Sequence, residues 1–97
     1  MNQRLPVPPH AALELHPQYR FQWEEKQQCH VLLFPEGLIQ LPGSAGKIIE
    51  QVDGTRTVDD IVKDLEASFP GVELKNDVVE FLEIAHAKGW IRAKTSQ

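Results

Sequence analysis

The stretch HVLLFPEGLIQL, residues 30–41, decides the fold of this chain. It consists of two apolar runs on either side of Pro35-Glu36-Gly37. Proline suits the first corner of a turn, and glycine can adopt the positive φ that closes a three-residue hairpin loop. The stretch therefore predicts a β-hairpin with its loop at these three residues.

A third strand is predicted just before the hairpin. Tyr19, Phe21 and Trp23 alternate with polar residues over residues 19–24. This is the period-two pattern of a half-buried strand. Together with the hairpin, the segment predicts a three-stranded antiparallel sheet.

Three short helices are predicted after the sheet, because apolar residues recur there at helical spacing. Their predicted starts and stops are Ser44 and Gly54, Thr57 and Pro70-Gly71, and Asn76 or Asp77 and Gly89. Ser44 is a favourable N-cap, and Thr57 followed by Asp60 resembles a capping box. Trp90 and Ile91 are then expected to form a buried anchor or a short terminal strand.

The predicted fold class is α+β, with a three-stranded antiparallel sheet followed by three helices. The spacing of the last two helices fits a helix-turn-helix with the hairpin as its wing, so the pattern is winged helix-turn-helix-like. We expect a proline-rich N-terminal arm over residues 1–17, one domain over residues 18–93 and a short tail over residues 94–97.

Composition limits the classes of function. The chain has 97 residues, 10 Lys and Arg against 14 Asp and Glu, a formal net charge of −4 and a single cysteine. This length fits one domain, and one cysteine excludes an internal disulfide framework. No apolar run approaches the roughly 18 residues of a membrane span, and the proline-containing N-terminus does not resemble a secretory signal. We therefore expect a cytoplasmic protein with no membrane partner, and the acidic balance argues against nucleic acid.

No motif predicts catalysis or a cofactor site. Gly46-Lys47 suggests a phosphate-binding loop, but that motif needs other residues where the chain has Leu41 and Ile48. The histidines and Cys29 lack the paired spacings of a zinc site, and nothing near Cys29 in the sequence would activate a thiol. We expect no catalytic residue, no cofactor and no metal.

A winged helix suggests DNA binding, but the charges argue against it. The third predicted helix, from Asp77 to Lys88, carries three acids and one lysine, a net charge of −2. The second, from Asp59 to Glu66, carries four acids and one lysine, a net charge of −3. Both helices would repel a duplex, so a winged-helix DNA-binding regulator is the less favoured alternative.

The edge of the predicted sheet is the candidate binding surface. The strand Leu38-Ile39-Gln40-Leu41 carries no charge, so it lacks the usual protection of an edge against pairing. An extended peptide can add to such an edge, and apolar residues of the third helix could line a groove beside it. The alternative is that these apolar side chains only fill the core.

A set of motifs extends over residues 19–91. Its members are Val31-Leu32-Leu33-Phe34-Pro35-Glu36-Gly37, Leu41, Asp53-Gly54, Thr57, Ile61, Leu65, Asp77-Val78, Phe81-Leu82 and Gly89-Trp90. In these motifs the sequence resembles the PqqD family of pyrroloquinoline quinone (PQQ) biosynthesis. That family is part of the peptide-recognition elements of ribosomal peptide-modification pathways, whose members resemble a winged helix.

The resemblance implies a peptide chaperone with no chemistry of its own. Members of the family bind the precursor peptide of the PQQ pathway and present it to a radical SAM enzyme, which crosslinks a Glu and a Tyr of that peptide. In the wider family, the leader peptide adds beside the third strand and packs against the third helix. The peptide-binding residues implied in this chain are Leu38, Ile39, Gln40, Leu41, Val78, Phe81, Leu82 and Ala85. Some of the helix residues among them must face the core instead.

One residue departs from the family pattern, and two further interpretations stay open. Pro42 stands where a polar residue, often Asn, is expected, and it removes a donor at the end of the edge strand. A quinone-binding carrier is a second alternative function. A homodimer through the N-terminal arm or the sheet edge is a further possibility for the assembly.

Overall fold

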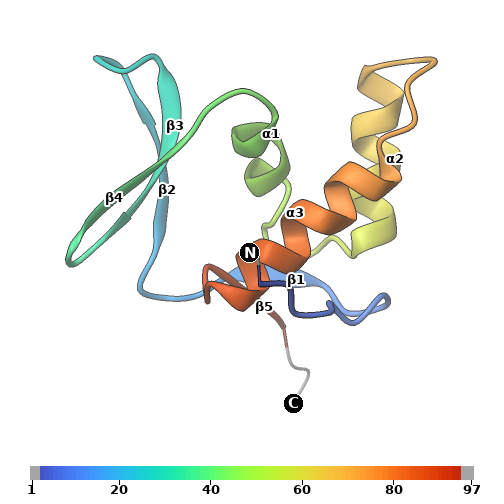
Figure 1. Cartoon of the computed structure of the whole chain (residues 1–97), viewed down its shortest axis with the longest axis horizontal. Helices are drawn as coiled ribbons and strands as arrows, with labels where there is room; N and C mark the ends of the chain where they lie inside the picture. Colours follow the sequence, from blue (N-terminus) through green and yellow to red (C-terminus); the bar gives the residue numbers. More distant parts are fainter. Residues whose placement is uncertain (1–2, 95–97) are drawn as a thin grey trace.

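The computed structural model describes residues 3–94 of the chain. A three-stranded sheet stands to one side of a body built from three helices and a pair of short strands (Figure 1). The elements follow one another as β1 (Leu13–Leu15), β2 (Arg20–Glu24), β3 (Cys29–Phe34), β4 (Gly37–Leu41), α1 (Ser44–Glu50), α2 (Val58–Ser68), α3 (Lys75–Ala87) and β5 (Ile91–Ala93).

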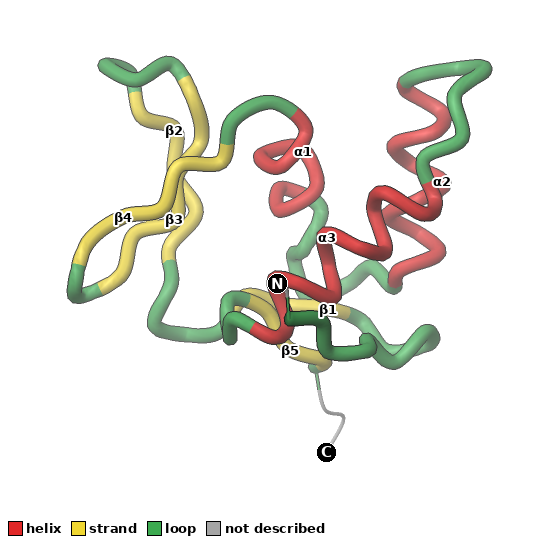
Figure 2. The backbone as a smooth tube through the Cα atoms, in the orientation of Figure 1, coloured by secondary structure: helices red, strands yellow, loops and turns green. Residues whose placement is uncertain are grey.

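The predicted three-stranded antiparallel sheet is confirmed. Its order is β2-β3-β4, with β3 in the middle (Figure 2). Phe34 lies opposite Gly37, so the loop of the hairpin consists of Pro35 and Glu36 alone. The predicted three-residue loop is therefore wrong. Gly37 is the first residue of β4, because the ladder closes one residue earlier than a three-residue loop would allow.

One face of this sheet packs against the rest of the protein. Leu32 and Leu41 lie on that face and belong to the main core, and Tyr19 and Phe21 pack at its margin. The prediction of a half-buried strand therefore holds for Tyr19 and Phe21. It is wrong for Trp23, which is 46% exposed, because this residue lies near the end of an edge strand where fewer neighbours surround a side chain.

The sequence does not predict the second sheet, which pairs β1 with β5 in antiparallel register. Leu13 of β1 is 1% exposed and belongs to the main core. A strand of three residues is too short to show a period, so the segment before residue 18 resembles an arm in the sequence. Ile91 confirms the predicted terminal strand. The boundary between arm and domain stays a prediction, and the tail beyond Lys94 lies outside the described residues.

The three predicted helices are confirmed, and α2 has the predicted capping box. The Thr57 hydroxyl accepts a hydrogen bond from the Asp60 N–H, and the Asp60 carboxylate accepts one from the Thr57 N–H. Two orphan donors at the start of the helix are satisfied in this way. The helix ends before Pro70-Gly71, as predicted.

The ends of α1 and α3 differ from the predicted ones. Ser44 is the first helical residue of α1, and the N-cap is Gly43 with a φ of 60°, a conformation that glycine adopts without strain. α1 ends at Glu50, well before the predicted stop at Gly54. α3 begins at Lys75, just before the predicted start.

A single core joins the two sheets and the three helices. It is built from aliphatic side chains on one face of β1, β3, β4, β5 and the three helices, together with Val52 after α1, which is the pattern expected of amphipathic elements. Its buried members are Leu13, Leu32, Leu41, Ile48, Ile49, Val52, Val58, Ile61, Val62, Leu65, Val78, Leu82, Ala85 and Ile91.

Candidate functional site: a sheet edge and a helix groove

The free edge of β4 is the first part of the candidate site. β4 pairs with β3 on one side and is the outer strand of the sheet. Phe34 and Gly37 flank a two-residue loop. In hairpins with such a loop the flanking residues form a hydrogen-bonded pair, and these pairs then alternate with non-hydrogen-bonded pairs along the ladder. The backbone N–H and C=O groups of Leu38 and Gln40 therefore point away from β3.

These outward groups are available to an incoming strand. Within residues 3–94, no other backbone group hydrogen-bonds to the outward N–H and C=O of Leu38 or Gln40. The Leu38 side chain is 42% exposed, and the Gln40 amide donates to the side-chain oxygen of Gln27 in the β2–β3 turn. Pro42 follows β4 and cannot donate. The free edge thus runs from Leu38 to Gln40.

The four α3 residues implied by the resemblance lie mostly in the core. Leu82 and Ala85 are 0% exposed and Val78 is 2% exposed, whereas Phe81 is half-buried. α3 packs against α2 and β5, whereas α1 packs against β3 and β4. The sequence could not separate these residues, because they form one continuous apolar stripe on α3.

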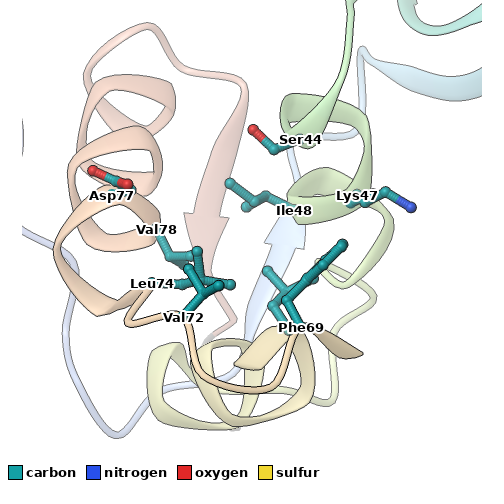
Figure 3. Close-up of a pocket in the computed structure, with 9 residues that line it drawn as sticks. Ser44, Lys47, Ile48, Phe69, Val72, Leu74, Asp77 and Val78 are labelled. Carbon is teal, nitrogen blue, oxygen red and sulfur yellow. The ribbon is translucent and has the colours of Figure 1, made fainter. Parts of the chain in front are cut away.

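A groove between α1 and α3 is the second part of the candidate site. We name it the α1–α3 groove; its volume is about 280 Å³. In Figure 3, Ile48 of α1 and Val78 of α3 face each other across it, with Phe69, Val72 and Leu74 at its lower end. The lining residues are Ser44, Lys47, Ile48, Leu65, Phe69, Val72, Leu74, Asp77 and Val78.

Of the sequence-predicted residues, Val78 is the member that lines this groove. Phe69 and Val72 were not predicted as site residues. The available signal was their position: two large apolar side chains flank the turn Pro70-Gly71, where polar residues are usual. Both side chains remain exposed, Phe69 by 42% and Val72 by 51%.

The rim of the groove carries charges of both signs. The Lys47 ammonium lies 5.8 Å from the centre of the Phe69 ring, which is a cation–π distance. Asp77 lies on the opposite side and also lines a second, polar cleft with Glu66 and Glu73. One Glu66 carboxylate oxygen accepts the Leu74 N–H at 2.8 Å, which fixes the α2–α3 connection beside the groove.

The N-terminal arm packs along another side of α3. The Arg4 guanidinium forms an ion pair with Glu83 at 2.6 Å, and the Leu5 N–H donates to the Glu83 carbonyl at 3.0 Å. The His86 ring nitrogen Nδ1 lies 3.2 and 3.1 Å from the carbonyl oxygens of Leu5 and Pro6. Glu83 and His86 lie on the flank of the helix away from Asp77, so this contact leaves the groove open.

Residues 3–94 meet neither the requirements of a metal site nor those of a membrane-spanning helix. No group of three or more His, Cys, Asp or Glu side chains in this range is placed to hold a metal ion. No helix in the same range has the length and apolar character needed to cross a membrane. The pKa of the Asp53 carboxyl is lowered, first by the hydrogen bond from the Thr55 side chain, but Asp53 does not line the groove.

Comparison with known proteins gives a family match and named relatives. The family described as coenzyme PQQ synthesis protein D (PqqD) matches residues 29–91. A protein of Stutzerimonas stutzeri named PqqA binding protein is 52% identical over 77 residues, which cover 78% of this chain and 84% of that protein. A PqqA binding protein of Acinetobacter baylyi is 51% identical over 74 residues, which cover 75% of each chain.

A solved structure matches the fold. It is the solution NMR structure of the PqqD truncation of Methylobacterium extorquens PqqCD, described as a stand-alone recognition element for ribosomally synthesized and post-translationally modified peptides. The TM-score is 0.72 at 24% sequence identity, and the match covers 89% of this chain and 94% of that chain. The winged-helix-like α+β fold is therefore shared.

Proposed function

The chain belongs to the PqqD family of coenzyme PQQ synthesis proteins, and on this premise we propose that it binds the ribosomal precursor peptide of PQQ biosynthesis. We propose further that it presents this peptide to the radical SAM enzyme of the pathway. The observation that carries the proposal is the free β4 edge, where the backbone groups of Leu38 and Gln40 point outward. It acts as a chaperone in the cytoplasm and not as an enzyme.

In the proposed complex, the peptide adds to the sheet as an antiparallel fourth strand. Its backbone pairs with the outward groups of Leu38 and Gln40, and Pro42 ends the ladder. Leu38 supplies exposed apolar surface beside the added strand. Phe81 is half-buried and is the α3 residue that the peptide can contact, while Val78, Leu82 and Ala85 support the site from the core.

The alternatives receive less support. A DNA-binding regulator would need a basic third helix, whereas α3 carries the acidic residues Asp77, Glu80 and Glu83. Arg4 forms ion pairs with Glu80 and Glu83, so this arginine is engaged within the chain itself. No observation favours a quinone-binding carrier. A homodimer through the β4 edge would use the same backbone groups as the peptide, so it would compete with peptide binding.

The test is an NMR titration of the chain with the PqqA peptide of Stutzerimonas stutzeri, combined with two variants of one residue. Gln40→Pro removes an outward N–H, and an edge strand tolerates proline where that N–H faces solvent. We expect its affinity to fall at least about tenfold, because the ring deletes a donor and obstructs the incoming strand. Gln40→Ala loses the same side chain and keeps the donor, so its affinity should stay within about twofold of the wild type.

Amide shifts in the wild type should concentrate in β4 and in the loop after it. If Gln40→Pro keeps its fold and binds as tightly as Gln40→Ala, strand addition at this edge is wrong. If the wild-type chain does not bind the peptide at all, the proposed function fails. Proline at Ile39 would not serve, because its N–H faces Leu32 within the hairpin and its loss would disturb folding.

A further inference from the structure

We infer that the α1–α3 groove is a second binding site for the same peptide. The groove binds one large apolar side chain of the peptide, and a basic residue of the peptide lies next to that side chain. This inference rests on the proposed function. It adds a binding position outside the sheet edge and a chemical preference for the sequence that fills it.

The groove has the size and lining of a side-chain pocket. Ile48, Leu65 and Val78 are buried and form its apolar floor. Phe69 and Val72 stand at its lower end and are among the exposed large apolar residues of the chain. An engineered apolar cavity of about 150 Å³ holds a benzene molecule, so about 280 Å³ accommodates an aromatic or a large aliphatic side chain.

The chain path joins the groove to the β4 edge. β4 ends at Leu41, and Ser44, the first residue of α1, already lines the groove. β4 runs toward α1, so an antiparallel peptide on its edge runs the other way. The part of the peptide that precedes the paired segment therefore reaches the groove, and the apolar anchor lies a few residues N-terminal to that segment.

The charges on the α3 side of the groove favour a cation. Asp77 has no ion-pair partner within residues 3–94. It stands where the groove meets the polar cleft, whose charged lining is Glu66, Glu73 and Asp77 against Lys75 alone. On the α1 side, Lys47 lies over the Phe69 ring. A Lys or Arg beside the apolar anchor would therefore be attracted toward Asp77.

The apolar part of the groove is tested with the double variant Phe69→Ala/Val72→Ala and the PqqA peptide of Stutzerimonas stutzeri. Loss of two side chains that contact the peptide in the groove should weaken peptide binding at least about tenfold. Leu5→Ala is the matched control, since Leu5 is 47% exposed on the arm and does not line the groove. Its affinity should stay within about twofold of the wild type.

The cation is tested with Asp77→Asn and Asp77→Lys. Binding should weaken about threefold for the first and more for the second, because charge reversal adds repulsion. Each Lys and Arg of the peptide is also replaced singly by Ala. One of these replacements should lose its own effect on affinity in the Asp77→Asn background, as a coupled pair requires.

The outcomes separate this inference from the proposed function. If Gln40→Pro weakens binding while Phe69→Ala/Val72→Ala and Asp77→Lys keep wild-type affinity, the groove is not a binding site and strand addition stands. If the groove variants weaken binding but no peptide cation couples to Asp77, the preference for a basic residue is wrong. If the folded wild-type chain does not bind the peptide, the proposed function itself fails.

Discussion

The two sheets of this protein differ in whether other backbone groups pair with their outer edges. In the small sheet, β1 pairs with β5 on one side, and on the other side Leu13 meets the chain between α1 and α2. The Leu13 N–H donates to the Arg56 carbonyl at 2.9 Å, and the Leu13 carbonyl accepts from the Gly54 N–H at 2.7 Å. In the large sheet, no backbone group within residues 3–94 covers the outward groups of Leu38 and Gln40 in this way.

This difference gives separate expectations for the two strands. A covered edge gains nothing from another strand, because its donors and acceptors are already paired. An open edge exchanges water for backbone partners when a peptide adds to it. We therefore expect the β1 edge to govern the free energy of unfolding and the β4 edge to govern peptide affinity.

The largest expected effect is on the covered edge. Leu13→Ala should lower the free energy of unfolding by about 3 kcal/mol, because the side chain is 1% exposed and its loss leaves a cavity in the core. Leu38→Ala, on the open edge, is the matched control and should change it by less than about 0.5 kcal/mol. Urea denaturation followed by tryptophan fluorescence measures both. Equal destabilisation by the two variants would contradict the comparison.

A smaller effect is expected from the residue that covers β1. Gly54 has a φ of 87°, and a Cβ there would meet Lys94 and Glu14 atoms at 3.8 to 4.0 Å, so the space is sufficient. Gly54→Ala should then cost about 1 to 2 kcal/mol through backbone strain alone. Gly54→Asn should cost less in the same urea experiment, because asparagine tolerates this conformation better. If Gly54→Ala leaves the free energy of unfolding unchanged, the backbone at Gly54 does not have this positive φ in solution.

The large sheet and the helices could be predicted because their signals are local. The turn residues Pro35-Glu36-Gly37 and the capping pair Thr57 and Asp60 act within a few positions of each other. The β1–β5 pair could not, since it joins Leu13 to Ala93 from opposite ends of the sequence through strands too short to show a period. The covered edge was missed for that reason, and the open edge was found.

The candidate site was only partly predictable for a related reason. The charge-free strand 38–41 is visible in the sequence, and so is the apolar stripe of α3. Which stripe residues face the core depends on what packs above them, so Leu82 and Ala85 could not be told apart from Phe81. The groove could not be foreseen either, because α1, α2, α3 and the α2–α3 connection each supply part of its lining.

The smallest expected effect concerns the turn that contains Gly54 and Arg56, whose backbone groups pair with Leu13 of β1. This effect depends on pH. The pKa of the Asp53 carboxyl is lowered, first by the Thr55 hydroxyl, which donates to it at 2.6 Å, and also by the Thr55 N–H and the nearby Arg56 charge. A lowered folded-state pKa adds stability above the unfolded value of about 3.9, and this stability is lost as the pH falls through the folded pKa.

Asp53→Asn should therefore destabilise the protein at pH 6 by less than about 1 kcal/mol, since the side chain is 41% exposed and exposed charge contacts are weak. The difference from the wild type should shrink as the pH is lowered from 6 toward 2.5, because the wild-type carboxyl becomes progressively protonated as the pH falls. Urea midpoints of both proteins at the two pH values measure it, and the other carboxylates cancel because both proteins carry them. Thr55→Ala removes the largest cause of the shift and should reproduce part of the change. A difference that does not vary with pH would mean that Asp53 holds the turn by its shape and not by its charge.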